Sequence, residues 1–322
     1  MARPWAIAGS GAMLRAVDGV SFDVRRREAV GLVGESGCGK STLARAIVGL
    51  APIASGSVRW RGRETVDGPH RPRDEMRCLR REVQMIFQDP LASLDPSMTI
   101  ERIVAEPLLT HRPWMSRAEV AARVRTMLER VGLEARHASR YPHEFSGGQC
   151  QRVGIARALI AEPRLLICDE SVSALDVSIR AQIVDLLRDL RRELSLSMLF
   201  VAHDLAVVKA ISTRVLVMYL GRIMEFGECA SIYGTPRHPY TRALLSAVPV
   251  PDPLRERHRR RVLLTGELPS PVDPPSGCVF RTRCPHAIEA CAQGTPPLET
   301  YGGGRSLVAC IRAGHIDSTN RI

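Results

Sequence analysis

The sequence is poor in lysine, in aromatic residues and in long hydrophobic runs. Lys40 and Lys209 are the only lysines among 45 basic residues, and Phe, Trp and Tyr make up 4% of the chain. Few aromatic rings leave few platforms for stacking bases, and the net charge of +11 is diffuse, so nucleic acid is not expected as a partner. Because the chain uses lysine almost nowhere else, the lysine at position 40 indicates a specific role for that side chain.

Membrane-spanning and secretory segments are not expected in this sequence. No stretch of about 18 apolar residues occurs, and the first residues, MARPWAIAGSGAML, lack the apolar core and cleavage site of a secretory signal. We therefore expect a cytoplasmic chain. With 45% hydrophobic and 25% charged residues the composition is globular, which excludes a disordered or fibrous chain.

Strand-like and helix-like segments alternate from residue 21 to about 235, which predicts a parallel sheet with helices on its faces. The expected strands are 28–33, 164–168, 198–202 and 215–220. Ser116 begins a capping box with Glu119, and Ser178 is expected to cap another helix. Beyond 235 the chain is rich in proline, so residues 1–235 and a smaller, loop-rich segment at 236–322 are predicted to be two domains.

The segment Gly34-Glu35-Ser36-Gly37-Cys38-Gly39-Lys40-Ser41 fits the phosphate-loop pattern G-x-x-x-x-G-K-[ST]. A strand precedes it and a helix follows, so backbone N–H groups and the positive end of the helix would face one anion. Lys40 would reach the β- and γ-phosphates of a nucleoside triphosphate, and the Ser41 hydroxyl would bind Mg²⁺. The alternative, a glycine turn with a chance Lys-Ser pair, does not explain this context.

A second motif is an apolar strand that ends in Asp169 and Glu170, which suits a site at the carboxyl edge of a sheet. Asp169 would hold Mg²⁺ through water. Glu170 would orient or deprotonate the attacking water, a role worth roughly 10²–10⁴ in rate. An ordinary acidic turn is the alternative if this motif stands alone.

Between these motifs lies Phe145-Ser146-Gly147-Gly148-Gln149, where Ser146 can cap a helix whose start two glycines leave open to a phosphate. A plain capped turn is the alternative. The order of the three motifs resembles that of ABC ATPases. This resemblance implies an α/β P-loop NTPase of the ABC type: a RecA-like parallel-sheet core, a helical signature subdomain, a reduced antiparallel β subdomain and a loop-rich C-terminal extension.

The resemblance also implies roles for other residues. Gln88 matches the glutamine that contacts Mg²⁺ and senses the transporter, Ser173-Ala174-Leu175-Asp176 matches the D-loop, and His203 matches the switch histidine at the γ-phosphate. A lone histidine after a strand is otherwise usually structural. In the family the signature caps ATP held by a second ATPase subunit, so two such domains close on ATP and hydrolysis separates them.

The predicted site has three sets of residues. The catalytic set is Glu170, His203 and Gln88. Mg²⁺ is assigned to Ser41 and Gln88, with Asp169 through water. The residues expected to contact ATP are Gly34, Glu35, Ser36, Gly37, Cys38, Gly39, Lys40, Ser41, Thr42, Ser146, Gly147, Gly148, Gln149, Asp169 and Asp176.

Several segments resemble the ATP-binding subunits of bacterial oligopeptide and dipeptide importers, the F-type subunit more than the D-type. They are RAVDGVSF, RYPHEFSGGQ, SALDVSIRAQI, VMYLGRIMEFG, HPYTRALLSAVP and the C-terminal GELPSPVDPPSGC. The resemblance implies ATP hydrolysis that drives import of peptides or a related solute such as nickel. The implied partners are two transmembrane permeases, a second and paralogous ATPase subunit and an extracytoplasmic solute-binding protein. The chain would be peripheral, at the cytoplasmic face of the inner membrane.

Two other functions compete with the importer. A soluble ABC ATPase acting on nucleic acid or ribosomes would carry long insertions or two cassettes, whereas a single uninterrupted cassette spans Gly34 to His203. A regulatory subunit that does not hydrolyse ATP would lack Glu170 or the signature, and both are present.

Four of the nine cysteines, Cys278, Cys284, Cys291 and Cys310, have the spacing C-x5-C-x6-C-x18-C. Zinc sites more often show closer pairs, whereas four thiolates on loops suit a [4Fe–4S] cluster, and similar cysteines recur in the peptide-importer ATPases. The cluster, zinc and free thiols stay open as alternatives, and a metal here would be structural or regulatory.

The chain departs from the family pattern at three places. Ser171 replaces the usual proline after the Asp-Glu pair, and Cys150 follows the signature where a basic residue is common. Neither change removes a catalytic group. Trp5 is the only ring near the position where the family stacks an aromatic residue on adenine, and a loop is expected there.

Overall fold

The computed structural model describes residues 14–68, 73–249, 262 and 264–316, so Trp5 lies outside the described residues. The chain divides into two compact units. We call Met1–Asp23, Val30–Leu43 and His203–Ile322 the phosphate-loop unit, and Val24–Ala29 with Ala44–Ala202 the signature unit. The predicted domain boundary at residue 235 stays a prediction.

In the phosphate-loop unit five strands lie in the order β1-β7-β8-β10-β9. β1 pairs in parallel with β7, with Val30 opposite Arg214, and the other pairs are antiparallel. All five residues of β1 are buried, as its apolar sequence predicts. The strands are β1 (Ala29–Val33), β7 (Arg214–Tyr219), β8 (Arg222–Glu228), β9 (Glu299–Tyr301) and β10 (Ser306–Val308). The helices are α7 (Leu205–Ile211), α8 (Cys229–Gly234), α9 (Pro239–Ser246) and α11 (Ala290–Gln293). α1 (Lys40–Ile47) begins in this unit.

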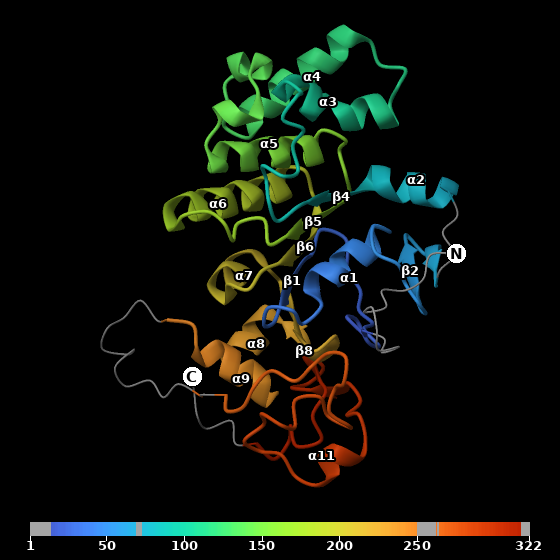
Figure 1. The fold of residues 1–322 in the computed structure, drawn as a ribbon, viewed down its shortest axis with the longest axis vertical. Coiled ribbons are helices and arrows are strands. Elements are labelled where there is room, and N and C mark those ends of the chain that lie inside the picture. Colours follow the sequence, from blue (N-terminus) through green and yellow to red (C-terminus); the bar gives the residue numbers. More distant parts are fainter. Residues whose placement is uncertain (1–13, 69–72, 250–261, 263, 317–322) are drawn as a thin grey trace. The chain divides into compact units, whose positions relative to one another are not determined.

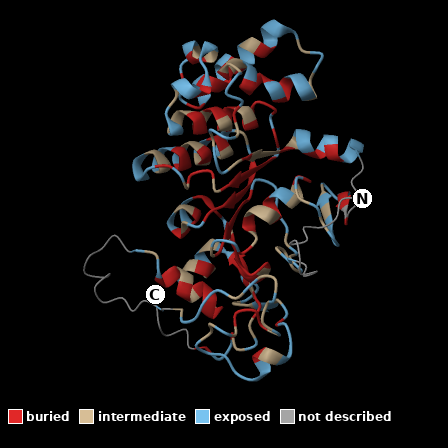
Figure 2. Ribbon diagram, in the orientation of Figure 1, coloured by how far each residue is buried: buried red, intermediate tan, exposed pale blue. Residues whose placement is uncertain are grey.

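In the signature unit three parallel strands lie in the order β4-β5-β6 (Figure 1). Figure 2 shows β5 and β6 buried along their length, which accounts for their uninterrupted apolar sequences. The strands are β4 (Val83–Ile86), β5 (Leu165–Asp169), β6 (Ser197–Val201) and the antiparallel pair β2 (Ser57–Trp60) and β3 (Arg63–Asp67). The helices are α2 (Arg73–Glu82), α3 (Ile100–His111), α4 (Arg117–Arg130), α5 (Gly147–Leu159) and α6 (Val177–Glu193), with short 3₁₀ helices η1 (Ala135–Ser139) and η2 (Pro142–Glu144). The predicted α/β fold with a mainly parallel sheet is confirmed.

Helix starts follow the local sequence, with one correction. Ser116 forms the predicted capping box with Glu119 at the start of α4. The prediction that Ser178 caps α6 is wrong. Asp176 is the N-cap, and its carboxylate accepts hydrogen bonds from the Ile179 N–H at 3.0 Å and the Ser178 hydroxyl at 2.8 Å. Because α6 starts at Val177, Ser178 already lies inside the first turn, whereas Asp176 stands at the N-cap, from which a side-chain oxygen reaches the exposed N–H groups.

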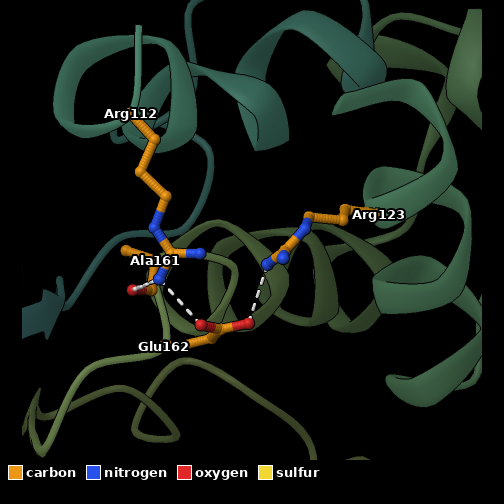
Figure 3. Close-up of polar contacts among 4 residues, drawn as sticks. All are labelled: Arg112, Arg123, Ala161 and Glu162. Carbon is orange, nitrogen blue, oxygen red and sulfur yellow. Dashed lines mark hydrogen bonds and ion pairs between the residues drawn. The ribbon is translucent and has the colours of Figure 1, made fainter. Parts of the chain in front are cut away.

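The helices α3, α4 and α5 pack together and are joined by a charged group that the sequence does not reveal (Figure 3). Glu162, just after α5, accepts from Arg112 at 2.7 Å and from Arg123 at 2.8 Å. The hydrogen bond from Arg112 is the main cause of a lowered pKa of Glu162. The group ties the ends of α3 and α5 to the face of α4. None of the described helices is both long enough and apolar enough to cross a membrane.

Candidate active site

The loop between β1 and α1 is folded so that two of its glycines have no room for a side chain. Gly34 has φ 154° and Gly39 has φ 102°. A Cβ at Gly34 would lie 2.2 Å from the Met218 carbonyl oxygen, and one at Gly39 would lie 2.1 Å from that of Ala16. The glycines of the motif are therefore required by backbone packing as well as by close approach to a phosphate.

Lys40 begins α1 and is buried, with 4% of its surface exposed. Its ammonium donates to the carbonyl oxygens of Gly34 at 2.9 Å and Glu35 at 3.0 Å. Nearby Cys38 is buried too, and burial raises the pKa of its thiol despite the opposing effect of Lys40. The loop thus encloses a single cation at the start of a helix, which is the arrangement an anion-binding loop needs.

Glu35 of the same loop is held from the C-terminal region. Its backbone N–H donates to the Tyr240 hydroxyl at 2.9 Å, and its carboxylate accepts from Arg283 at 2.8 Å. The sequence does not indicate Tyr240 or Arg283 as partners of the loop. No local signal could have found them, since they lie 205 and 248 residues away along the chain.

In the signature unit the structure brings Gln88, Asp169 and Glu170 together. Gln88 follows β4 and Glu170 follows β5, and these strands are parallel neighbours, so their carboxyl ends meet. The Gln88 amide donates to the Glu170 carboxylate at 3.0 Å. Asp169 is fully buried and lies 3.7 Å from the guanidinium of Arg45, a residue that sequence analysis did not identify. Glu170 has φ 47°, an uncommon conformation for a glutamate that often marks functional sites.

The signature segment forms the start of α5. The Ser146 hydroxyl accepts from the Gln149 N–H at 3.3 Å, and the Gln149 side chain accepts from the Ser146 N–H at 3.0 Å. A Cβ at Gly148 would lie 2.7 Å from a methyl group of Ile179 on α6, so this glycine allows the two helices to approach. Cys150 is fully buried. The signature helix is therefore capped by its own residues.

The remaining predicted residues are placed as follows. Ser41 and Thr42 lie in the first turn of α1, and His203 is exposed between β6 and the Asp204 cap of α7. The phosphate loop, Thr42, His203 and the four C-terminal cysteines belong to the phosphate-loop unit. The signature unit holds the remaining predicted residues, which are Gln88, Ser146, Gly147, Gly148, Gln149, Asp169, Glu170 and Asp176. Their roles toward ATP stay predictions.

The four C-terminal cysteines line one small cavity of about 20 Å³. Burial raises the pKa of Cys278, Cys310 and Cys284, the last to about 11, and the thiols influence one another. Within the described residues, however, no three His, Cys, Asp or Glu side chains are arranged to hold a metal ion. The structure thus gathers the cysteines without forming the tight tetrahedron that zinc requires.

Comparison with known proteins agrees with these motifs. A family described as "ABC transporter" matches residues 17–173, and one described as "Oligopeptide/dipeptide transporter, C-terminal region" matches residues 224–291. The protein cbiO1 from Clostridium perfringens, part of the ABC transporter complex cbiONQ, has a TM-score of 0.61 at 28% identity, covering 68% of this chain and 84% of that one. The ATP-binding cassette MJ0796, bound to ADP and Pi, has a TM-score of 0.60 at 31% identity over 66% and 90% of the two chains.

The fold and motifs define an ATPase of the ATP-binding cassette class, which uses ATP and Mg²⁺. Oligopeptide transport ATP-binding protein OppF of Escherichia coli is 60% identical over 299 residues, 93% of this chain and 88% of the relative. The OppF protein of Salmonella typhimurium is 59% identical over the same coverage. The chain therefore belongs to the family of oligopeptide transport ATP-binding proteins.

Proposed function

We propose that this chain hydrolyses ATP to power a membrane importer of oligopeptides, dipeptides or a related solute. The observation that carries the proposal is the contact between Gln88 and Glu170. It links the residue expected to activate water to the residue expected to sense the permease. The names of the relatives support the solute class.

In the proposed mechanism Lys40 and Ser41 would hold the triphosphate and Mg²⁺, and Asp169 would hold Mg²⁺ through water. Bound Mg²⁺ would supply positive charge that offsets the charge developing on the γ-phosphate. Glu170 orients or deprotonates the attacking water, and His203 contacts the γ-phosphate. Ser146 and its neighbours in the signature act on ATP held by a second, paralogous ATPase subunit, so the active form is a dimer.

The permease contact is proposed at a cavity of about 570 Å³ in the signature unit. Its lining combines apolar residues such as Met85 and Phe87 with the arginines Arg77 and Arg80 of α2. Gln151, fully buried, also lines it, and neither polar atom of its side chain has a hydrogen-bond partner among the residues that the structure describes. A cytoplasmic helix of a permease with an acidic residue fits this mixture of charge and apolar surface. The chain is then peripheral, at the cytoplasmic face of the inner membrane.

The test is purification of the tagged chain from native membranes in mild detergent, followed by mass spectrometry. We expect two multispanning permeases, a second ATPase and a solute-binding protein. Reversing the charges of Arg77 and Arg80 to glutamate should reduce permease recovery about tenfold, because acidic partners are then repelled. Arg130→Glu, at an exposed site on α4, is the matched control. Recovery of ribosomal or DNA-bound proteins without a permease would contradict the proposal and favour the soluble alternative.

We also propose that Cys278, Cys284, Cys291 and Cys310 hold a [4Fe–4S] cluster. Their grouping around one cavity supports this. A cluster places its own atoms between the thiolates, so it suits thiols farther apart than a single ion allows. We expect about four iron and four sulfide per chain after anoxic purification, and loss of both in Cys284→Ser. Iron-free protein from anoxic cells, with all four thiols titratable, would exclude the cluster.

A further inference from the structure

The phosphate loop is held by the C-terminal region through one residue, Glu35. Glu35 contacts the Tyr240 hydroxyl and the Arg283 guanidinium, and both contacts involve buried or half-buried groups. The side chains of Arg283 and Glu35 are 11% and 26% exposed. At this exposure solvent screens the ion pair less than it screens a surface pair, so it has a larger effect.

The partners of Glu35 are themselves rigidly held. Tyr219, Tyr240 and Phe280 form a cluster of rings with centroids 4.8 to 5.3 Å apart. The guanidinium of Arg283 lies 6.0 Å from the centre of the Tyr219 ring. The backbone N–H of Arg283 donates to the backbone carbonyl oxygen of Phe280 at 3.0 Å. Arg283 therefore approaches Glu35 from a packed support, and little side-chain freedom is lost when the pair forms.

The start of α9, which carries Tyr240, is fixed by a buried carboxylate. Glu225 on β8 is fully buried and accepts from the N–H groups of Arg237 at 2.9 Å and His238 at 3.0 Å. The His238 ring accepts from the Tyr240 N–H at 3.1 Å. These hydrogen bonds hold the first turn of α9 in place. They therefore also hold the Tyr240 hydroxyl in place beside the Glu35 N–H of the phosphate loop.

The negative charge of Glu35 makes its contacts with Arg283 and Tyr240 important for the binding of ATP. A carboxylate in the phosphate loop repels a triphosphate bound there, because like charges at short range in a half-buried site interact strongly. The Arg283 guanidinium neutralises that carboxylate, and the Tyr240 hydroxyl accepts a hydrogen bond from the backbone N–H of Glu35. We propose that Arg283 and Tyr240 are positioning residues for the nucleotide, which hold Glu35 in place and cancel its charge beside the triphosphate.

This inference rests on the proposed nucleotide site, and its test separates the two. The affinity of the full chain for a fluorescent ATP analogue with Mg²⁺ is measured beside thermal unfolding without nucleotide. We expect Arg283→Gln to weaken binding about tenfold, Arg283→Lys to weaken it less, and Tyr240→Phe to weaken it about threefold. Glu35→Gln alone is the reference for the double variant. In the Glu35→Gln background, Arg283→Gln should weaken binding by no more than about threefold, because no uncompensated charge remains.

Arg281→Gln is the matched control, since the Arg281 guanidinium bonds to Ser276 within its own loop at 2.8 Å. Wild-type affinity in Arg283→Gln would overturn the inference. A double variant as weak as Arg283→Gln would also overturn it, because the arginine would then act through the fold and not through the charge of Glu35. If the wild-type chain itself binds no nucleotide, the proposed site fails and the inference fails with it.

Discussion

A Glu170→Gln variant should bind ATP with wild-type affinity and hydrolyse it at least about 100-fold more slowly. The amide keeps the size of the side chain and can still hydrogen-bond to Gln88, which lies 3.0 Å from the carboxylate. It cannot accept a proton from water or polarise it as a carboxylate does. The measurement is phosphate release by the purified chain with its partner subunits, beside ATP affinity in the same buffer.

Glu162→Gln is the control for this experiment. Glu162 also has a positive φ, of 57°, but it pairs with Arg112 and Arg123 among the helices α3 to α5 (Figure 3). We expect this variant to lose about 1 kcal/mol of stability at most, since the Glu162 side chain is 58% exposed, and to keep its ATPase rate. Equal rates in Glu170→Gln and wild type would show that another group activates water.

A Lys40→Ala variant should bind ATP about 100-fold more weakly than wild type, because a charged donor to two phosphate groups is removed. In the structure this ammonium is buried and donates to two carbonyl oxygens of its own loop, so it is already in place beside the phosphate site. Binding of a fluorescent ATP analogue measures the loss, with thermal unfolding as a check on folding.

The chain offers a matched control in its other lysine. Lys209 is exposed on α7 and lies 5.4 Å from the centre of the Tyr233 ring. Lys209→Ala removes the same charge and should leave ATP affinity unchanged. If both variants bound ATP like wild type, the loop from Gly34 to Ser41 would not be the nucleotide site.

The parts of the molecule that sequence could predict are those in which neighbours along the chain determine the structure. Uninterrupted apolar runs located β1, β5 and β6 to within a residue or two. The Ser116 capping box was predicted because both of its partners lie within one turn. The cap of α6 was predicted at Ser178, two positions beyond the true cap Asp176, because the exact start of a helix depends on backbone geometry.

The parts that sequence could not predict depend on contacts between distant segments. Nothing near Glu35 indicates Arg283 or Tyr240, and nothing near Asp169 indicates Arg45. The spacing of the cysteines left a cluster, zinc and free thiols open, and it did not reveal the cavity that all four cysteines line. Such contacts are determined by how strands and loops pack, and one sequence does not reveal that packing.

The most direct test of the account is peptide uptake. The chain would be reconstituted with its co-purified permeases and second ATPase in vesicles, with the solute-binding protein and a labelled peptide on the opposite face. We predict accumulation that requires ATP on the side of this chain and is lost with Glu170→Gln. Hydrolysis of ATP without accumulation of peptide or any other solute, together with stimulation of the ATPase by ribosomes or nucleic acid, would contradict it.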